Sequence, residues 1–371
     1  MDVTEQAGRV EDASHTCISG MDQRSVLVPL GGFMGAGKTT LILSAARRLR
    51  ARGLKAAAIL NDQGAELVDT RYAQSQGVDA DQVTGGCFCC RFSGLVEAAD
   101  RLKTHAPDVI FAEAVGSCTD ISATTLQPLK LHYADRLRLA PYSVLVDPQR
   151  AQDLAAPDAD PDLFFLFHKQ IEEADLVCYT KSDLYTYFPQ LSGAPVRYLS
   201  PLTGEGVDAW LDEVLTGHIQ PGAHILEIDY ERYARAEASL AWLNCSLTVT
   251  LNPPLSPPHL VGPLLDDLDA ALTSAGMRIV HLKLMDSSAS GYLKASIVGN
   301  GGEPGLEGML DASPSAVHEL LLNVRATGSP EMLLHAVESQ IARIPGKLEI
   351  EAMQCFSPAA PHPEFRYARP P

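Results

Sequence analysis

The chain has 371 residues, of which 46% are hydrophobic and 20% charged, a composition that predicts a folded protein of about two domains. Its formal net charge of −17 would repel a phosphate backbone, so we expect no nucleic-acid partner. No apolar run approaches the roughly 20 residues that span a bilayer, and the first 24 residues are too polar for a secretory signal. We therefore expect a cytoplasmic protein without a membrane partner, whose eight cysteines are reduced.

Short apolar strands alternate with helical patterns through the first part of the chain. Residues 1–24 are expected to form a flexible tail, and 25–222 a domain of the P-loop α/β class. Strands that are apolar throughout need cover on both faces, so the pattern predicts a mostly parallel sheet between helices. The expected strands are 25–30, 55–60, 109–112, 142–146 and 176–180, and the expected helices are 39–52, 162–174 and 207–215.

The pattern changes after Pro221-Gly222. Residues 223–240 are expected to be a partly helical linker, and 241–356 a smaller α+β domain with ferredoxin-like layering. We expect a loop at 299–315 and a proline-rich tail, extended on the surface or disordered, at 357–371. Within the second domain the expected strands are 245–251, 277–285, 291–298, 317–326 and 347–354, and the expected helices are 259–276 and 330–343.

The segment Gly32–Thr40 reads GFMGAGKTT and fits the pattern G-x-x-x-x-G-K-[ST] between a predicted strand and a predicted helix. In such a loop the backbone N–H groups surround the phosphates. We expect Lys38 to reach the β- and γ-phosphate oxygens and Thr39 to bind Mg²⁺. The alternative is a glycine-rich turn with an incidental lysine. The expected nucleotide-binding residues of this segment are Gly32, Gly35, Ala36, Gly37, Lys38, Thr39 and Thr40.

The strand predicted at 109–112 leads into the segment Glu113-Ala-Val-Gly116. Behind a phosphate loop, Glu113 is a candidate to contact Mg²⁺ or its water, and the Gly116 N–H a candidate to sense the γ-phosphate. Taken alone, a glutamate at a strand end is usually just solvated.

Two later segments indicate which base is bound. Thr180-Lys181-Ser182-Asp183 resembles the guanine motif NKxD, in which the aspartate accepts from guanine, although a helix cap would also account for it. The loop that starts at Ser200 resembles the SAxTGEG loop that closes over the base. Together they favour GTP over ATP. Thr180 replaces an asparagine whose amide ties this motif to the phosphate loop, so we expect weaker base binding.

Three cysteines lie within four residues in Gly86-Cys87-Phe88-Cys89-Cys90. As thiolates, Cys87, Cys89 and Cys90 could hold Zn²⁺, Co²⁺ or Ni²⁺, and a tetrahedral site then needs a fourth ligand. An open site of this kind suits metal transfer. A redox switch or a buried apolar group remains as an alternative. We expect Cys118 to be a small buried residue rather than a ligand; the other candidates for the fourth ligand are His105, His132 and His168.

With these motifs together, the chain resembles the CobW-type metallochaperone GTPases of the SIMIBI class. The matching segments run from about residue 25 to 216 and also include Asn61-Asp62-Gln63-Gly64 and Leu145-Val-Asp147. The resemblance implies a domain that binds Mg·GTP and hydrolyses it slowly, with Asp62 near Mg²⁺ and the transition metal. It also implies delivery of the metal to a client metalloprotein or a cobalamin-pathway enzyme. No oligomeric state is predicted.

These features lead to a hypothesis. GTP orders 62–64 and 113–116, which repositions the cysteine loop and raises its metal affinity, and hydrolysis releases the metal to a partner on the C-terminal domain. A nickel-enzyme maturation GTPase would share this mechanism. The rival classes are a regulatory or assembly GTPase with structural cysteines, and a redox- or zinc-sensing module with a decayed nucleotide site.

Overall fold

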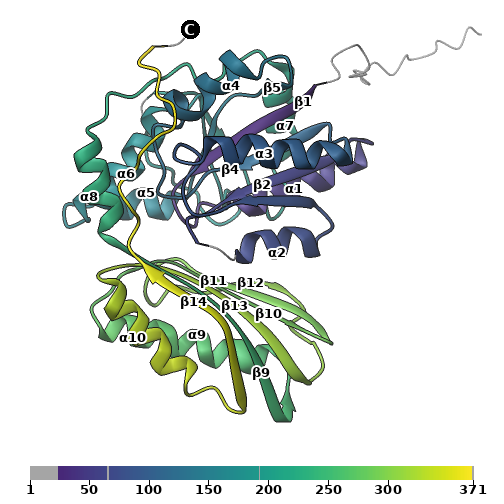
Figure 1. The fold of residues 1–371 in the computed structure, drawn as a ribbon, viewed down its shortest axis with the longest axis vertical. Helices are drawn as coiled ribbons and strands as arrows, with labels where there is room; N and C mark the ends of the chain where they lie inside the picture. The colour runs from purple at the N-terminus through teal and green to yellow at the C-terminus, as the bar shows by residue number, and fades with distance from the viewer. Residues whose placement is uncertain (1–23, 65–66, 192, 370–371) are drawn as a thin grey trace, which may run out of the picture.

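A computed structural model describes residues 24–64, 67–191 and 193–369, and its two β-sheets lie one above the other along the molecule (Figure 1). The flexible tail expected at residues 1–24 lies outside the described residues except for Arg24, as do Pro370 and Pro371. Among the described residues, no helix combines the length and apolarity needed to cross a membrane.

The first sheet has the order β3-β2-β4-β1-β6-β7-β8, with β5 also against β1, and every pairing in it is parallel. Leu27 packs in the core beneath α3 and α6, while Val26 and Val28 pack in the opposite core beneath α1 and α7. The predicted parallel sheet between helices is thus confirmed. Its strands are β1 (Ser25–Gly32), β2 (Ala56–Asn61), β3 (Asp79–Val83), β4 (Val109–Glu113), β5 (Leu137–Leu139), β6 (Ser143–Val146), β7 (Leu176–Tyr179) and β8 (Val196–Tyr198). Its helices are α1 (Lys38–Ala51), α2 (Val68–Ser75), α3 (Phe92–Leu102), α4 (Gln127–His132), α5 (Pro148–Ala155), α6 (Pro161–Glu172) and α7 (Val207–Thr216), with a 3₁₀ turn at Lys103–His105 and a π-helix at Ser122–Leu126.

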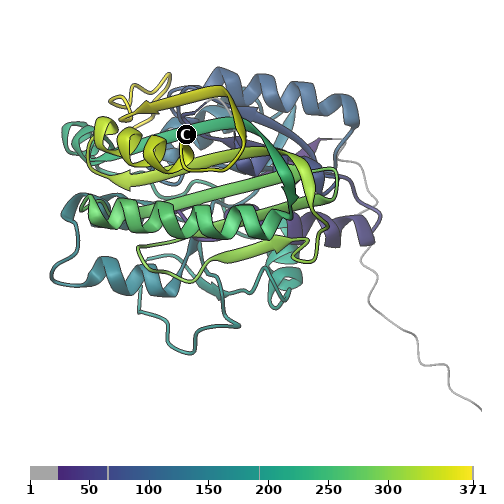
Figure 2. The ribbon, with the colours of Figure 1, turned by 90° about the horizontal axis from the view of Figure 1, so that it is seen from below.

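The second sheet is antiparallel, with the order β12-β11-β10-β13-β9-β14. The order β10-β13-β9-β14, with a helix after β9 and another after β13, is that of a ferredoxin-like βαββαβ unit, to which β11 and β12 are added at one edge. Both helices cover the sheet face that points away from the first domain (Figure 2). The elements are β9 (Leu240–Leu255), α9 (Pro257–Ser274), β10 (Ile279–Ser288), β11 (Gly291–Ile297), β12 (Gly305–Gly308), β13 (Ser315–Thr327), α10 (Pro330–Ile341) and β14 (Lys347–Phe356).

The loop expected at 299–315 contains β12, which pairs with β11 from Leu293 opposite Gly308 to Ser296 opposite Gly305. The expectation of a loop throughout was wrong because two of the four residues of β12 are glycines, which have poor strand propensity. The hydrogen bonds to β11 stabilise a strand that the local sequence does not favour.

The segment between the two sheets contains helix α8 (Tyr230–Ala238), which begins at Asp229, whose side chain accepts hydrogen bonds from the first turn. Tyr233 and Glu237 on this helix are buried, and α8 packs on α6. The segment expected to be a linker therefore contributes to the core of the first domain.

The proline-rich tail runs from β14 back along the first domain (Figure 1). The Glu364 N–H donates to the Cys89 carbonyl at 2.9 Å, and the Tyr367 N–H donates to the Ala123 carbonyl at 3.1 Å. The described part of the tail is thus extended, as one of the two expectations had it, and it is docked beside the cysteine loop.

Candidate nucleotide and metal site

The loop between β1 and α1 presents a strongly curved backbone at the carboxyl end of the parallel sheet. Gly37 has φ +87° and precedes α1, and no described side chain caps this helix. The Lys38 ammonium lies over the loop and donates to the Gly32 carbonyl at 2.8 Å. A helix start of this kind offers its N–H groups and the positive end of its dipole to an anion.

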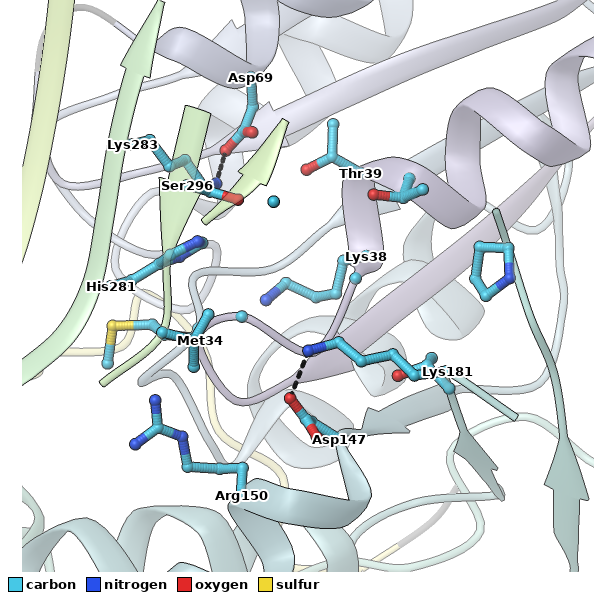
Figure 3. A pocket seen from close by; sticks show the side chains of 18 of the residues that line it. Met34, Lys38, Thr39, Asp69, Asp147, Arg150, Lys181, His281, Lys283 and Ser296 are labelled. Atoms are coloured by element: carbon cyan, nitrogen blue, oxygen red, sulfur yellow. Dashed lines mark hydrogen bonds and ion pairs between the residues drawn. The ribbon is translucent and has the colours of Figure 1, made fainter. Parts of the chain in front are cut away.

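A cavity of about 650 Å³ opens over this loop, and both domains line it. Its size falls within the roughly 300–1,000 Å³ common for small-molecule sites. Figure 3 shows Lys283 and His281 from the second sheet facing the same space as Lys38 and Arg150. Beside eight carboxylates, six cationic side chains line this cavity. They are Lys38, Arg150, Lys181, Lys283, Lys294 and Arg325.

Thr39 and Glu113 meet at the start of α1. The Thr39 hydroxyl donates to Glu113 Oε2 at 2.9 Å, and Lys38 Nζ lies 4.0 Å from Glu113 Oε1. Burial lowers the pKa of Lys38 and raises that of Glu113. Hydroxyl and carboxylate oxygens are the ligands that Mg²⁺ prefers, so this pair fits Mg²⁺ beside bound phosphates. Gly116 and Thr40 also line the cavity.

The predicted base-binding segments line the same cavity. Asp183, Lys181 and Ser200 all border it, and Lys181 Nζ pairs with Asp147 at 2.6 Å. The Thr180 hydroxyl donates to the Ala36 carbonyl of the phosphate loop at 2.9 Å. Thr180 therefore contacts the phosphate loop through its hydroxyl, although it lacks the asparagine amide, and the weaker base binding expected from the sequence stays a prediction.

Asp62 lines the cavity, but its carboxylate faces the second domain. Both of its oxygens lie 2.8 Å from Arg325 Nη2 on β13. The same segment approaches the second sheet closely: a Cβ on Gly64 would lie 1.4 Å from Asn244 Nδ2. The segment predicted to respond to nucleotide is thus in contact with the C-terminal domain.

Asn61 links the nucleotide cavity to the cysteine loop, and the sequence analysis did not single it out. The residue lines the cavity, while its side-chain amide donates to the Gly86 carbonyl at 2.8 Å and accepts from the Phe88 N–H at 2.8 Å. In the sequence, Asn61 is a polar residue at the end of an apolar strand and belongs to the segment 61–64 that carries part of the family resemblance. No role was predicted for it.

The cysteine loop gathers its thiols into one cluster. Cys87 Sγ lies 2.7 Å from Cys89 Sγ and 3.6 Å from Cys90 Sγ, and Cys90 Sγ lies 3.5 Å from Cys89 Sγ. Cys87 and Cys89 are buried, and Cys90 is half-buried. None of the described cysteines forms a disulfide.

Cys118 joins this cluster, contrary to the expectation that it is only a small core residue. The Sγ atoms of Cys87, Cys89 and Cys118 all lie within 4.8 Å of one another. Hydrogen bonding with Cys87 and Cys89 lowers the pKa of Cys118 to about 6, while contact with Cys118 raises the pKa of both partners. Among these three thiols, Cys118 is thus the one that loses its proton most readily, and the thiolate is the form that binds metal.

The three candidate histidines lie elsewhere. His105 is exposed beside Asp79, His168 stacks on Phe164, and the His132 ring pairs with the Tyr367 hydroxyl at 2.9 Å. None of them belongs to the group of cysteines that, among the described residues, could hold a metal ion.

A phosphate loop at the end of a parallel strand, with a threonine–glutamate pair behind it, defines a P-loop nucleotide-binding protein. Residues 26–194 match the CobW/HypB/UreG nucleotide-binding domain. The resemblance noted in the sequence is thus confirmed for these residues, which make up less than half of the chain.

The chain is also similar to proteins of known name. The chain is 30% identical over 162 residues to the zinc chaperone YjiA of Escherichia coli, an alignment that covers 42% of this chain and 48% of the relative, about half its length. The crystal structure of nickel-bound HypB from Helicobacter pylori matches 53% of this chain and 87% of that one, at 19% identity and a TM-score of 0.41. That of Zn(II)-bound YjiA GTPase from E. coli matches 88% of this chain and 100% of that one, at 18% identity and a TM-score of 0.37.

Proposed function

We propose that this protein is a GTP-hydrolysing metallochaperone. It binds a divalent transition metal, Zn²⁺ first and Co²⁺ or Ni²⁺ as alternatives, through Cys87, Cys89 and Cys90. It passes the metal to a client metalloprotein or a cobalamin-pathway enzyme. The domain family and the zinc and nickel proteins among its relatives support this proposal.

The observation that carries the proposal is the double contact of Asn61. One residue borders the nucleotide cavity, and its side chain holds the backbone of the cysteine loop on both sides of Cys87. A change in the cavity that moves Asn61 must move the thiols with it. A nucleotide hydrolase with unrelated structural cysteines has no need of this link.

The chain's own residues divide the work on GTP. Lys38 and the loop N–H groups neutralise the β- and γ-phosphates, while Asp183 and Ser200 bind and enclose the guanine. Thr39 and Glu113 would hold Mg²⁺, which, when bound, offsets the charge that develops on the phosphates. The Gly116 N–H faces the γ-phosphate, and its displacement after hydrolysis loosens the cysteine loop.

Nucleotide and metal binding by the purified chain tests the proposal. We expect tighter binding of GTP and GDP than of ATP by calorimetry, and slow GTP hydrolysis that Lys38→Ala abolishes. We expect one Zn²⁺ per chain under reducing conditions, lost in the variant with serine at positions 87, 89 and 90 while GDP binding survives. Cys355→Ser, at a half-buried cysteine of the second domain, is the control and should keep the metal.

The rival classes predict other results. Structural cysteines would make the chain unfold on chelation, with no effect of nucleotide on the metal. A redox- or zinc-sensing module would hydrolyse no GTP. Equal affinity for ATP and GTP, or full metal binding by the triple-serine variant, would contradict the proposal.

A further inference from the structure

One cysteine outside the CxCC segment lies inside the thiol cluster. Cys118 is buried with 1% of its surface exposed, and its Sγ lies 4.0 Å from Cys89 Sγ. In a tetrahedral zinc site with Zn–S bonds of about 2.3 Å, neighbouring sulfurs lie about 3.8 Å apart. The sulfurs of Cys87, Cys89 and Cys118, all within 4.8 Å of one another, need only small shifts to surround one metal ion.

Cys90 occupies a different position in the cluster. Its thiol is half-buried and accepts a hydrogen bond from the His362 N–H of the C-terminal tail at 3.2 Å. The tail therefore covers Cys90 from outside, while Cys118 reaches the cluster from the interior. The inner thiols are shielded from solvent, and the outer one can exchange a metal with a partner.

We propose that Cys118 is a metal ligand that binds a tetrahedral divalent ion such as Zn²⁺ or Co²⁺ together with Cys87 and Cys89, with Cys90 as the outer, exchangeable thiol. Each ligating thiol gives its proton to solvent as it binds the ion. This inference rests on the proposed metal-binding function, to which it adds a ligand from outside the CxCC segment.

The position of Cys118 connects the metal to the nucleotide. Cys118 lies two residues after Gly116, which borders the nucleotide cavity, and its N–H closes a turn onto the Val115 carbonyl at 3.0 Å. The buried Gln170 amide donates to the carbonyls of both Gly116 and Cys118, at 2.9 Å each. Gly116 and Cys118 therefore move together, and a displaced Gly116 pulls one ligand out of the metal site.

Cobalt titration of the full-length chain tests the inference. The intensity of the sulfur-to-cobalt charge-transfer band grows with the number of bound thiolates. In Cys118→Ala the band should therefore be weaker by the contribution of one thiolate. Because a change beside a metal ligand already costs about 10–100-fold in affinity, loss of the ligand should weaken Co²⁺ binding at least tenfold. Cys245→Ala, the same change at an equally buried cysteine of the second domain, should match the wild type.

A second variant keeps the test decisive if Cys118→Ala does not fold, as judged by GDP binding. In Cys90→Ser the X-ray absorption spectrum of bound zinc should count three sulfurs if Cys118 is a ligand and two if it is not. An unchanged cobalt spectrum in Cys118→Ala, or two sulfurs in Cys90→Ser, overturns the inference and leaves the proposed function standing. A wild-type chain that binds no cobalt or zinc overturns both.

Discussion

At the scale of single residues, the candidate site depends on side chains that connect loops. Thr180 ties the base-binding segment to the phosphate loop through the Ala36 carbonyl, and Asn61 ties the cavity to the cysteine loop. Both side chains are buried, so the loss of either contact leaves a backbone carbonyl without its hydrogen bond.

Removal of the Thr180 hydroxyl tests the first of these connections. A buried hydrogen bond contributes about 1 kcal/mol, so Thr180→Ala should weaken GDP and GTP binding by a similar factor of about five. Calorimetric titration with each nucleotide measures this. Thr216→Ala removes an exposed hydroxyl that donates to the Glu213 carbonyl on α7 and should leave both affinities unchanged. Unaltered nucleotide affinity in Thr180→Ala would show that the contact does not order the base site.

The sequence predicted the motif residues but not the residues that join them. The phosphate loop, Asp183 and the three clustered cysteines each stand in a recognisable local pattern. Cys118, Asn61 and Gln170 come together only through the fold, and each alone is a common residue in an unremarkable context. Their roles follow from distances between segments that are far apart in the sequence.

At the scale of elements, helix α8 joins both candidate switch segments. Glu237 accepts hydrogen bonds from Ser117 at 3.1 Å and from Gln63 at 3.4 Å, and burial raises its pKa to about 7. The Tyr233 hydroxyl, one turn earlier, accepts from the Thr119 N–H at 3.1 Å. This helix is therefore in contact with the segments on both sides of the metal site.

The raised pKa of Glu237 predicts a pH-dependent stability. The folded protein keeps a proton on Glu237 up to about pH 7, whereas the unfolded chain releases it near pH 4.5. The stabilisation is complete below the lower value and is lost as the pH rises to the upper one. Relative to Glu237→Gln, the wild type should lose up to about 3 kcal/mol of unfolding free energy over this range.

Denaturant unfolding at several pH values, with reductant and without metal, measures this difference. Glu231→Gln, at an exposed position of the same helix, is the control and should follow the wild-type profile. A constant difference between the wild type and Glu237→Gln across the range would show that Glu237 does not titrate on unfolding.

Sequence patterns predicted the elements of the first sheet that are long and apolar, and missed those that are short or polar. Strand β3 reads DADQV, with only its last residue buried, and α2 has eight residues. In the fold, β3 pairs with β2, and α2 packs against these two strands. No local sequence pattern encodes these contacts. Proline content likewise predicted a tail that is extended or disordered, but not that it docks beside the cysteine loop.

At the scale of the whole molecule, the second sheet closes the nucleotide cavity. Lys283 pairs with Asp69 on α2 (Figure 3). Arg325 pairs with Asp62, so both contacts cross between the domains. The tail of the same C-terminal domain lies over the cysteine loop. One domain thus touches both the nucleotide cavity and the thiol cluster.

The central claim is that nucleotide and metal affect each other's binding to the protein. The most direct test is to measure the dissociation constant of Zn²⁺ for the protein bound to a non-hydrolysable GTP analogue and for the protein bound to GDP. We predict at least about fivefold tighter Zn²⁺ binding with the analogue, and by reciprocity the same factor in the effect of Zn²⁺ on the affinity ratio of the two nucleotides. Equal Zn²⁺ affinity in the two nucleotide states would contradict the account.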